Sequence, residues 1–570
     1  MWTTCFEVIA MNRTYAPFYW ANEKSRTFTS RGYFQPGVTT EQRVREIGDA
    51  AERILGIPGF SDKVYDYASR GWISFATPIW VNFGQPKGLP ISCFNSHIPD
   101  SMEGIAYSVS ENMMMSKNGG GTSSFWGKVR SRGSDIKNNG KSEGSVTFMR
   151  LFETMIDVSK QGNSRRGIHA PYLPIDHGDI EEFLTIRQDG APIQNLYPGV
   201  CISDDWMLDM IAGDVDKRRI WAKVLQSRAA IGTPYLFFTD AANRGKPDVY
   251  QDLGLEIRGS NVCTEIMLPS DDKEDITLQE GESFVCDLSS PNLLHYDEWK
   301  DTDLIETITF ILDAVMTEFI EKAKNIPFFE RAVRFAERHR ALGIGCIGHF
   351  SYLQSKMWAF ASPAAREWNV EVYALIQKQS YAASAKLAEM FGEPELLKGY
   401  GRRNSTLMAI APTTSSAFII GQASQSIEPP KSNYFVKDLA KIKVTEKNPY
   451  LLELLQEKQQ NTPEVWDSIL KNNGSVQHLD FLSPEEREVF LTFSEINQYE
   501  IIQQAADRQV YIDQGQSINL MIHPKTPAKE VNKLYIDAWS LGLKSLYYHH
   551  SVNAAQEFRR EALVCSNCEG

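Results

Sequence analysis

The change of pattern near residue 76 constrains the fold more than any other feature of the chain. Residues 40 to 75 carry helical periodicity, and Thr39 or Thr40 is suited to cap the first helix. From about 76 to 300 the chain instead alternates short apolar runs with glycine clusters, which is typical of strands and loops that alternate with helices. We therefore predict a short helical region over residues 1–75, followed by a mixed α/β domain.

The length of the chain sets the scale of that domain. At 570 residues the chain is too long for one ordinary core, but a large barrel with attached helices can hold most of it. Helical periodicity is clear over 302–325 and 363–392, and the polar stretch 437–500 predicts surface helices. After Val552 the chain is polar and charged, so we expect a mobile tail over 553–570.

The composition excludes several classes of protein. There is no run of about 18 apolar residues to span a membrane, and the N-terminal sequence lacks the basic start and cleavage site of a signal peptide, so we expect a cytoplasmic protein. The formal charge of -13 argues against a general nucleic-acid binder, because phosphate contacts need clustered Lys and Arg. Eight scattered cysteines are too few for a disulfide scaffold, and most are expected to be buried apolar side chains.

Two glycine clusters are candidates for nucleotide contacts. They are SKNGGGTSS at 116–124 and KQGNSRRG at 160–167. Glycine lets the backbone approach a phosphate closely, because it has no Cβ and adopts positive φ. Neither cluster matches the Walker A or the dinucleotide-binding fingerprint, so by themselves they are more typical of flexible loops.

The segment GSNVCTEIMLP places Asn261, Cys263 and Glu265 at alternate positions. In an extended strand or finger these three side chains project to the same side. An amide, a thiol and a carboxylate that meet at one point suit catalysis better than a core. The alternative is an ordinary strand edge whose polar residues face solvent.

The pattern Asn-x-Cys-x-Glu, followed by CDLSSPNL, resembles the finger loop and next strand of the large (α) subunit of ribonucleotide reductase. The resemblance extends from about residue 70 to the C-terminus through ordered blocks: ATPIWVNFG, ISCFNSHIPDS, RHRALGIGCIG, APTTSSAFIIGQASQSIEPPK, AADRQVYIDQGQSINL and LKSLYYHH. It implies a ten-stranded α/β barrel over 76–552, made of two parallel five-stranded halves set antiparallel. With the helical insertions expected at 437–500, the resemblance also places Cys263 on a finger loop inside the barrel.

The same resemblance implies a radical reduction of ribonucleoside diphosphates to deoxyribonucleotides. Cys263 would be the transient thiyl that removes the ribose 3'-hydrogen, Glu265 the general base for the 3'-hydroxyl, and Asn261 the residue that orients the sugar hydroxyls. Cys93 would protonate the departing 2'-hydroxyl. Cys286 would be its redox partner, so the two thiols would supply two electrons and close to a disulfide.

Further residues match substrate and effector contacts of the family. The substrate contacts implied are Thr77, Ser92, Thr413, Thr414, Ser415 and Ser416, of which the last four resemble a phosphate cradle and are also compatible with a plain N-cap. Asp100 and Ser101 align with residues that hold a dNTP or ATP effector, with Mg²⁺, at a homodimer interface. The stretches 117–137 and 161–169 would be the two effector-sensing loops. In these loops Arg130 would bind phosphate, and Gln161, Arg165 and Arg166 would read bases.

Tyr547 and Tyr548 lie in SLYYHHSV, which reads as a strand, and two such tyrosines are commonly packing residues. Their place in LKSLYYHH resembles the pair through which class I enzymes receive a radical from a separate small (β) subunit, with no cofactor or metal of this chain's own. The main rival is a class II enzyme that uses adenosylcobalamin and needs no such pair. A glycyl-radical enzyme and a catalytically dead nucleotide-binding regulator agree less well with the motifs.

The final residues EALVCSNCEG contain Cys565 and Cys568. Such a pair could be half of a zinc site, a disulfide, or a dithiol that carries electrons; no second ligand pair at zinc-finger spacing accompanies it. About 15 residues at roughly 3.3 Å each give the tail a reach of about 50 Å. We predict a shuttle that reduces the Cys93–Cys286 disulfide and is itself reduced by thioredoxin or glutaredoxin. Because the first 70 residues show no ATP-cone pattern, we expect no overall inhibition by dATP.

Overall fold

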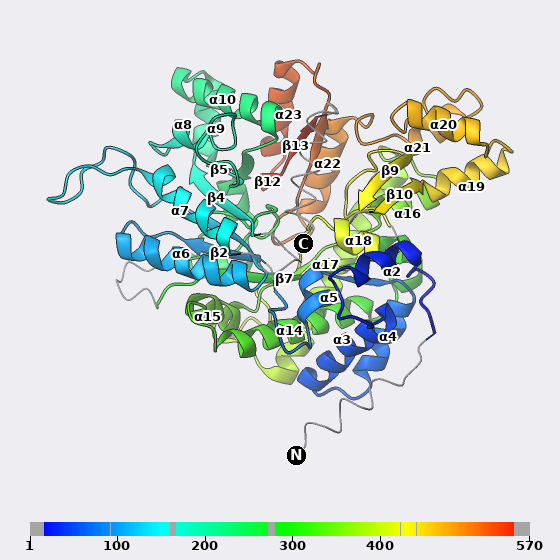
Figure 1. Ribbon diagram of the computed structural model, residues 1–570, viewed down its shortest axis with the longest axis horizontal. Helices are drawn as coiled ribbons and strands as arrows, with labels where there is room; N and C mark the ends of the chain where they lie inside the picture. The colour runs from blue at the N-terminus through cyan, green and yellow to red at the C-terminus, as the bar shows by residue number, and fades with distance from the viewer. Residues whose placement is uncertain are drawn as a thin grey trace.

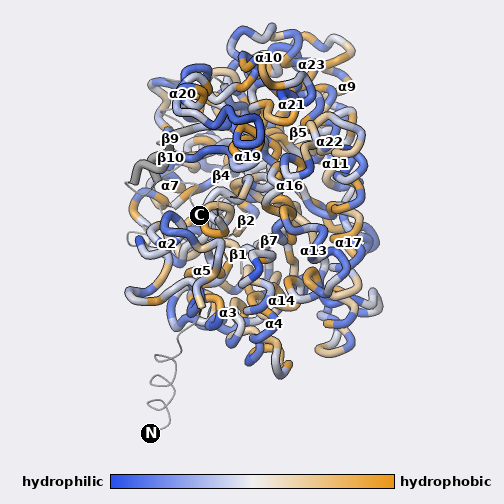
Figure 2. Tube along the Cα trace, turned by 90° about the vertical axis from the view of Figure 1, so that its right-hand side faces the viewer, coloured by the Kyte–Doolittle hydropathy of each residue, from blue (hydrophilic) through white to orange (hydrophobic). Residues whose placement is uncertain are grey.

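The computed structural model describes residues 16–91, 93–159, 167–271, 280–421, 423–439 and 442–551 (Figure 1). Strands surround the centre of the molecule, and helices cover them on the outside. The N-terminal helices α3 (Thr40–Leu55) and α4 (Phe60–Ser69) lie at one end, and α10 (Val215–Ile231) and α23 (Ala528–Ser540) lie at the other (Figure 2). The strands between these two ends hold the site.

The first half of the barrel is a parallel sheet. Its strands, in spatial order, are β2 (Cys93–His97), β3 (Gly121–Phe125), β4 (His169–Pro174), β5 (Gly199–Ile202) and β6 (Tyr235–Phe238). Between them the chain forms α6 (Met102–Lys117), α7 (Ser145–Val158), α8 (Ile180–Phe183), α9 (Asp204–Ala212) and α10. Parallel strands need such crossover helices, which explains the alternation read from the sequence.

The second half runs antiparallel to the first. It consists of β7 (Phe284–Pro291), β8 (Leu342–Ile344), extended segments around residues 408–410 and 516–520, and β12 (Ser545–Leu546). Strand β7 pairs antiparallel with β2, and β12 pairs antiparallel with β6, so the two halves meet at two seams. Each half therefore has five segments, and the predicted ten-stranded α/β barrel is confirmed.

Helices outside the barrel follow the periodicity of the sequence. Helix α3 begins after Thr39, whose side chain forms a capping box with Gln42, and ends at Gly56 in the left-handed conformation. The two long predicted helices are α14 (Leu304–Ala323) and α17 (Pro363–Phe391). Helix α14 is buried on nearly all sides, because it packs against β7, α3 and α17. Helix α14 therefore lies between the N-terminal helices and the barrel.

The region from 434 to 497 differs in part from the prediction of surface helices. Strands β9 (Tyr434–Leu439) and β10 (Ile442–Lys447) pair as an antiparallel hairpin. The polarity of this stretch suggested helices, but its Val and Thr residues favour strands. The helices that follow are α19 (Pro449–Glu457), α20 (Pro463–Lys471) and α21 (Pro484–Val489). They bury a separate small core that includes Leu451, Leu455, Trp466, Ile469 and Phe490.

The stretch SLYYHHSV forms two short strands instead of one. Strand β12 pairs with β6, and β13 (His549–Ser551) pairs parallel with β11 (Leu520–Ile522), so Tyr547 and Tyr548 lie between two sheets. The remaining elements are α2 (Glu23–Ser30), β1 (Ile73–Phe75), α5 (Thr77–Asn82), α11 (Thr239–Arg244), α12 (Asp248–Asp252), η2 (Leu293–His295), α13 (Tyr296–Trp299), α15 (Glu330–His339), α16 (His349–Ser355), η3 (Glu395–Leu397), α18 (Thr414–Ile419) and α22 (Gln498–Gln509). Among the described residues, no helix combines the length and the apolar character needed to cross a bilayer.

Candidate active site

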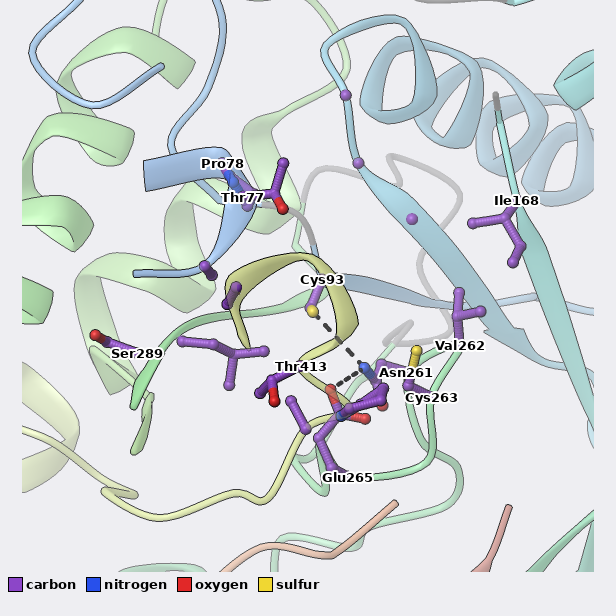
Figure 3. Close-up of a pocket in the computed structure, with 18 of the residues that line it drawn as sticks. Thr77, Pro78, Cys93, Ile168, Asn261, Val262, Cys263, Glu265, Ser289 and Thr413 are labelled. Carbon is purple, nitrogen blue, oxygen red and sulfur yellow. Dashed lines mark hydrogen bonds between the residues drawn. The ribbon is translucent and has the colours of Figure 1, made fainter. Parts of the chain in front are cut away.

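The finger loop carries Asn261, Cys263 and Glu265 into one cavity (Figure 3). Of the two expected backbones, an extended strand or a finger, the structure has a finger whose tip is a turn: Thr264 adopts φ +70°, and its N–H faces the Asn261 carbonyl at 3.4 Å. No neighbouring strand pairs with residues 261–265 within the described chain, so the alternation of a sheet does not apply. The three side chains converge because the turn folds them around the same space.

Several hydrogen bonds hold this turn in place. The Tyr172 hydroxyl on β4 donates to the Asn261 carbonyl at 2.7 Å, and the Ile266 amide donates to Asn261 Oδ1 at 3.1 Å. The Gly515 amide donates to the Glu265 carbonyl at 2.8 Å. The finger loop is thus held from both halves of the barrel, which keeps its side chains preorganised.

Glu265 is a buried carboxyl with two hydrogen-bond donors. Asn261 Nδ2 donates to Oε1 at 2.9 Å, and the Ser517 hydroxyl donates to Oε2 at 3.0 Å. Burial raises the pKa of Glu265 to about 7, and the two hydrogen bonds oppose that rise because they favour the ionised form. A carboxyl with this pKa is able to accept and return a proton near neutral pH.

Cys93 and Cys286 face each other across the β2/β7 seam. They are direct partners in the antiparallel register, and directly opposed residues have Cα atoms about 4.5–5.5 Å apart. Disulfides need Cα separations of about 4.4–6.8 Å, so the pair suits reversible closure. The two sulfurs are not joined in a disulfide in this structure, and burial raises the pKa of Cys286 well above its usual range. Asn261 Nδ2 lies 3.6 Å from the Cys93 sulfur and so links this pair to the finger loop.

The two tyrosines lead to Cys263. The Tyr547 hydroxyl donates to the Cys263 sulfur at 3.4 Å, and the Tyr547 and Tyr548 ring centroids are 4.3 Å apart. Tyr235 on β6 packs against both rings, at 4.7 Å and 5.1 Å. Tyr548, Tyr547 and Cys263 therefore form a continuous series of contacts.

The predicted substrate contacts divide into two groups. Thr77, Thr413 and Ser416 line the cavity beside Cys93 and the finger loop. Within the described residues the buried Thr77 hydroxyl has no hydrogen-bond partner, whereas Ser416 Oγ donates to the Phe75 carbonyl. Thr414 and Ser415 belong to the same turn of α18 but do not line this cavity.

The predicted effector residues lie together where α6 begins. Ser101 caps this helix through the Gly104 amide, and Arg130 Nε donates to Asp100 Oδ2 at 2.8 Å. Asp100 thus neutralises the guanidinium that we expected to bind phosphate. The stretch 117–137 is not a single loop, because β3 occupies its first part. Four other predicted residues and the tail pair lie outside the described residues: Ser92, Gln161, Arg165, Arg166, Cys565 and Cys568.

Ser517 is a site residue that the sequence did not reveal. Its hydroxyl faces two acceptors, the Cys263 carbonyl at 2.5 Å and Glu265 Oε2 at 3.0 Å. Ser517 belongs to the block AADRQVYIDQGQSINL, which resembles the family, but nothing local in that block predicts a contact with a residue 252 positions away. Tyr172 and Gln514, whose amide lies 3.8 Å from the Cys286 sulfur, were missed for the same reason.

Comparisons with known proteins agree with this geometry. The model of the ribonucleotide reductase barrel domain matches residues 91–215, 208–397 and 394–549. A putative ribonucleoside-diphosphate reductase large subunit of Frog virus 3 is 36% identical over 92% of this chain and 95% of its own length. The large subunit of Invertebrate iridescent virus 3 is 32% identical over 90% of this chain and 92% of its own length.

A solved structure gives the same result. The class Id ribonucleotide reductase alpha subunit of Actinobacillus ureae is 54% identical, with a TM-score of 0.89 over 95% of this chain and 99% of that one. The chain belongs to the ribonucleotide reductase family. Within that family it is of the large-subunit, class I kind and not the cobalamin-dependent kind.

Proposed function

We propose that this chain reduces ribonucleoside diphosphates to 2'-deoxyribonucleoside diphosphates by a radical that forms on Cys263. The observation that carries the proposal is the single cavity that collects Cys263, Glu265, Asn261 and Cys93. Cys263 also contacts Tyr547, so a thiol, a proton acceptor and a reductant surround the space for one sugar ring. Neither a dead regulator nor a simple nucleotide-binding module needs this combination.

The radical enters along the tyrosine pair. A small (β) subunit would supply it at Tyr548, and Tyr547 would then take the hydrogen atom from the Cys263 thiol. Tyrosine suits this role because it loses an electron and a proton together, and the contact of 3.4 Å allows direct transfer to sulfur. The chain itself then needs no resident cofactor.

The residues of the cavity would each carry one part of the reduction. The Cys263 thiyl takes the 3'-hydrogen while Glu265 takes the 3'-hydroxyl proton, and the 2'-hydroxyl leaves as water after protonation by Cys93. The second hydrogen of the thiol pair passes to C2' as Cys93 and Cys286 supply two electrons and close to a disulfide. Glu265 then returns its proton to the 3'-oxygen, and Cys263 returns the hydrogen to C3', which restores the thiyl. Asn261 orients the sugar and the Glu265 carboxyl. One nucleotide, reduced by two thiols, thus yields a deoxynucleotide, water and a disulfide.

Substrate and effector would bind on either side of this centre. Thr77, Thr413 and Ser416 face the cavity and would contact substrate, together with Ser92, Thr414 and Ser415. A dNTP or ATP effector, with Mg²⁺, would bind at Asp100, Ser101 and Arg130 across a homodimer, with Gln161, Arg165 and Arg166 sensing its base. Binding there requires the Arg130–Asp100 ion pair to rearrange.

Regeneration would depend on the C-terminal dithiol. Cys286 is fully buried, so a bulky thioredoxin or glutaredoxin could not reach the disulfide directly. Cys565 and Cys568 would exchange with it and would be reduced again outside the barrel.

The decisive experiment compares radical sources. The purified chain should turn over with a radical-bearing small subunit and not with adenosylcobalamin. Tyr548→Phe should lose turnover and keep nucleotide binding, because phenylalanine retains the ring and removes the oxidisable hydroxyl. Turnover with cobalamin alone, or full activity of Tyr548→Phe, would refute the proposal.

A further inference from the structure

Glu111 on α6 is a buried carboxylate that bridges two strands of the barrel. Its side chain has no exposed surface. The Ser96 hydroxyl on β2 donates to Oε2 at 2.7 Å, and the Ser283 hydroxyl, immediately before β7, donates to Oε1 at 2.7 Å. Both oxygens are therefore used, and each is bound by a different side of the β2/β7 seam.

The position of this bridge relates it to the two redox cysteines. The paired register runs from Cys93 opposite Cys286 to Asn95 opposite Phe284. Ser96 and Ser283 are the next residues along, where the paired register ends. Each serine is three residues from its cysteine, so the serines project from the opposite face of the seam. Glu111 thus joins the strands from outside, one step beyond the last backbone pair.

A second buried charge accompanies Glu111. Arg331 on α15 has a guanidinium nitrogen 3.9 Å from Glu111 Oε2, and its side chain is 1% exposed. Arg331 Nη2 also donates to the carbonyls of His97 and Asp271, at 3.4 Å and 3.2 Å. Asn112 Nδ2 donates to the Ser96 hydroxyl at 3.0 Å. The arginine therefore holds the end of β2 in the same network.

Burying this network has an unfavourable free energy compared with filling the same space with apolar side chains. Burying two charges costs solvation that their attraction does not dependably return, and the best-attested use of buried polar groups is to fix register. In this protein the register is that of the β2/β7 pairing, which places Cys93 opposite Cys286. Disulfide closure needs Cβ atoms about 3.5–4.5 Å apart, whereas opposed strand residues start at about 4.5–5.5 Å. The β2/β7 pairing must therefore keep the two cysteines opposite each other, so that their Cβ atoms need to move only about 1 Å closer to form the disulfide.

We propose that Glu111 is a positioning residue that clamps the β2/β7 seam and so sets how readily Cys93 and Cys286 form their disulfide. This inference rests on the proposed function of those two cysteines.

The test measures the equilibrium constant for closure of the Cys93–Cys286 disulfide. The full chain is equilibrated with glutathione buffers of graded ratio, alkylated, and mapped by mass spectrometry for the Cys93–Cys286 bond. Glu111→Gln removes the charge and one acceptor oxygen, so the equilibrium constant for closure should fall about tenfold, a rise of about 30 mV in potential. Glu41→Gln is the matched control, because Glu41 is another buried carboxylate, paired with Arg26 far from the seam.

A milder pair of variants guards against misfolding. Ser283→Ala removes only the hydrogen bond from Ser283 to Glu111 and should lower the equilibrium constant for disulfide closure about threefold. Ser227→Ala removes a buried hydroxyl bond to the Thr233 carbonyl and should leave it unchanged. Amide hydrogen exchange over residues 93–97 and 284–286 should quicken in Ser283→Ala and not in Ser227→Ala.

The outcomes separate the two levels of inference. If Glu111→Gln and Ser283→Ala keep the wild-type equilibrium constant for the Cys93–Cys286 disulfide, the proposal is refuted whatever their exchange rates. If the wild-type protein forms no Cys93–Cys286 disulfide during turnover, the proposed redox roles fail. The effect of Glu111 on disulfide formation would be overturned with them, and hydrogen exchange would then report only whether Glu111 holds the two strands together.

Discussion

Replacing Ser517 by alanine is the most informative single perturbation of the proposed base. The Ser517 hydroxyl donates to Glu265 Oε2 at 3.0 Å, and the hydroxyl proton is shared with the Cys263 carbonyl at 2.5 Å. Its hydrogen bond favours the ionised carboxylate and so opposes burial, which raises the pKa of Glu265 to about 7. Ser517→Ala leaves burial in place and removes one opposing contact. The pKa of Glu265 must therefore rise.

The size of the rise follows from the energy of that contact. A hydrogen bond to a charged group contributes about 1.5–3 kcal/mol, and the shared proton places this one at the lower end. At about 1.4 kcal/mol per pKa unit, the pKa of Glu265 should rise by about one unit, to about 8. The ionised fraction at pH 7 then falls from about one half to about one tenth, so kcat/KM should fall about fivefold.

The assay is the pH dependence of kcat/KM with saturating small subunit. The acid limb of the profile should move to higher pH by about one unit in Ser517→Ala, and the activity should recover on the alkaline side. Ser545→Ala is the matched control, because Ser545 donates to the Thr264 carbonyl of the same finger loop at 3.0 Å but not to the carboxylate. An unmoved acid limb in Ser517→Ala, or an equal shift in Ser545→Ala, would refute the assignment of Glu265 as the base.

Three further predictions test other parts of the structure. The pKa of Glu265 is about 7 in the folded chain and 4.5 ordinarily, so the folded state holds this proton more tightly than the unfolded state. The free energy of unfolding of the wild type should therefore fall by about 3 kcal/mol as the pH rises from 4.5 to 7. Glu265→Gln should be inactive, and its free energy of unfolding, measured with denaturant at pH 5 and pH 8, should not show this fall. Cys565→Ser with Cys568→Ser should allow about one turnover per site, and multiple turnover with thioredoxin should be lost, which a rapid-quench product count measures. In Gly199→Ala a Cβ would meet the Tyr172 ring at 2.4 Å, so the variant should lose about 1–3 kcal/mol of unfolding free energy and most of its kcat.

Each of these has a clear contrary result. Glu265→Gln with wild-type pH dependence of stability would show that the carboxyl titrates normally. Full multiple turnover of the double cysteine variant would remove the shuttle. Gly259→Ala is the control for Gly199→Ala, because its added Cβ would lie at an ordinary 3.4 Å from Tyr172. Equal losses of unfolding free energy in both variants would show that the clash with the Tyr172 ring is not the cause.

The helices were the most predictable part of the fold. Leu304–Ala323 and Pro363–Phe391 were evident from periodicity, and Thr39 was one of two candidates for the first N-cap, because these signals are local. The hairpin at 434–447 was missed because composition outweighed its Val and Thr residues. The turn at Thr264 was missed because residue alternation does not reveal a positive φ. Local rules fail where long-range contacts decide the backbone.

The sequence by itself determined which chemical groups this protein can use. The pattern around Cys263, the ordered blocks and the paired tyrosines were enough to predict the family, the barrel and the main reacting residues. Only the tertiary structure decided how those groups act together. It sets Cys93 opposite Cys286, brings Tyr547 to Cys263, buries Glu265 until its pKa is about 7, and joins β2 to β7 through Glu111. The physical reason is that distances and desolvation depend on residues far apart in the chain, which no local pattern records.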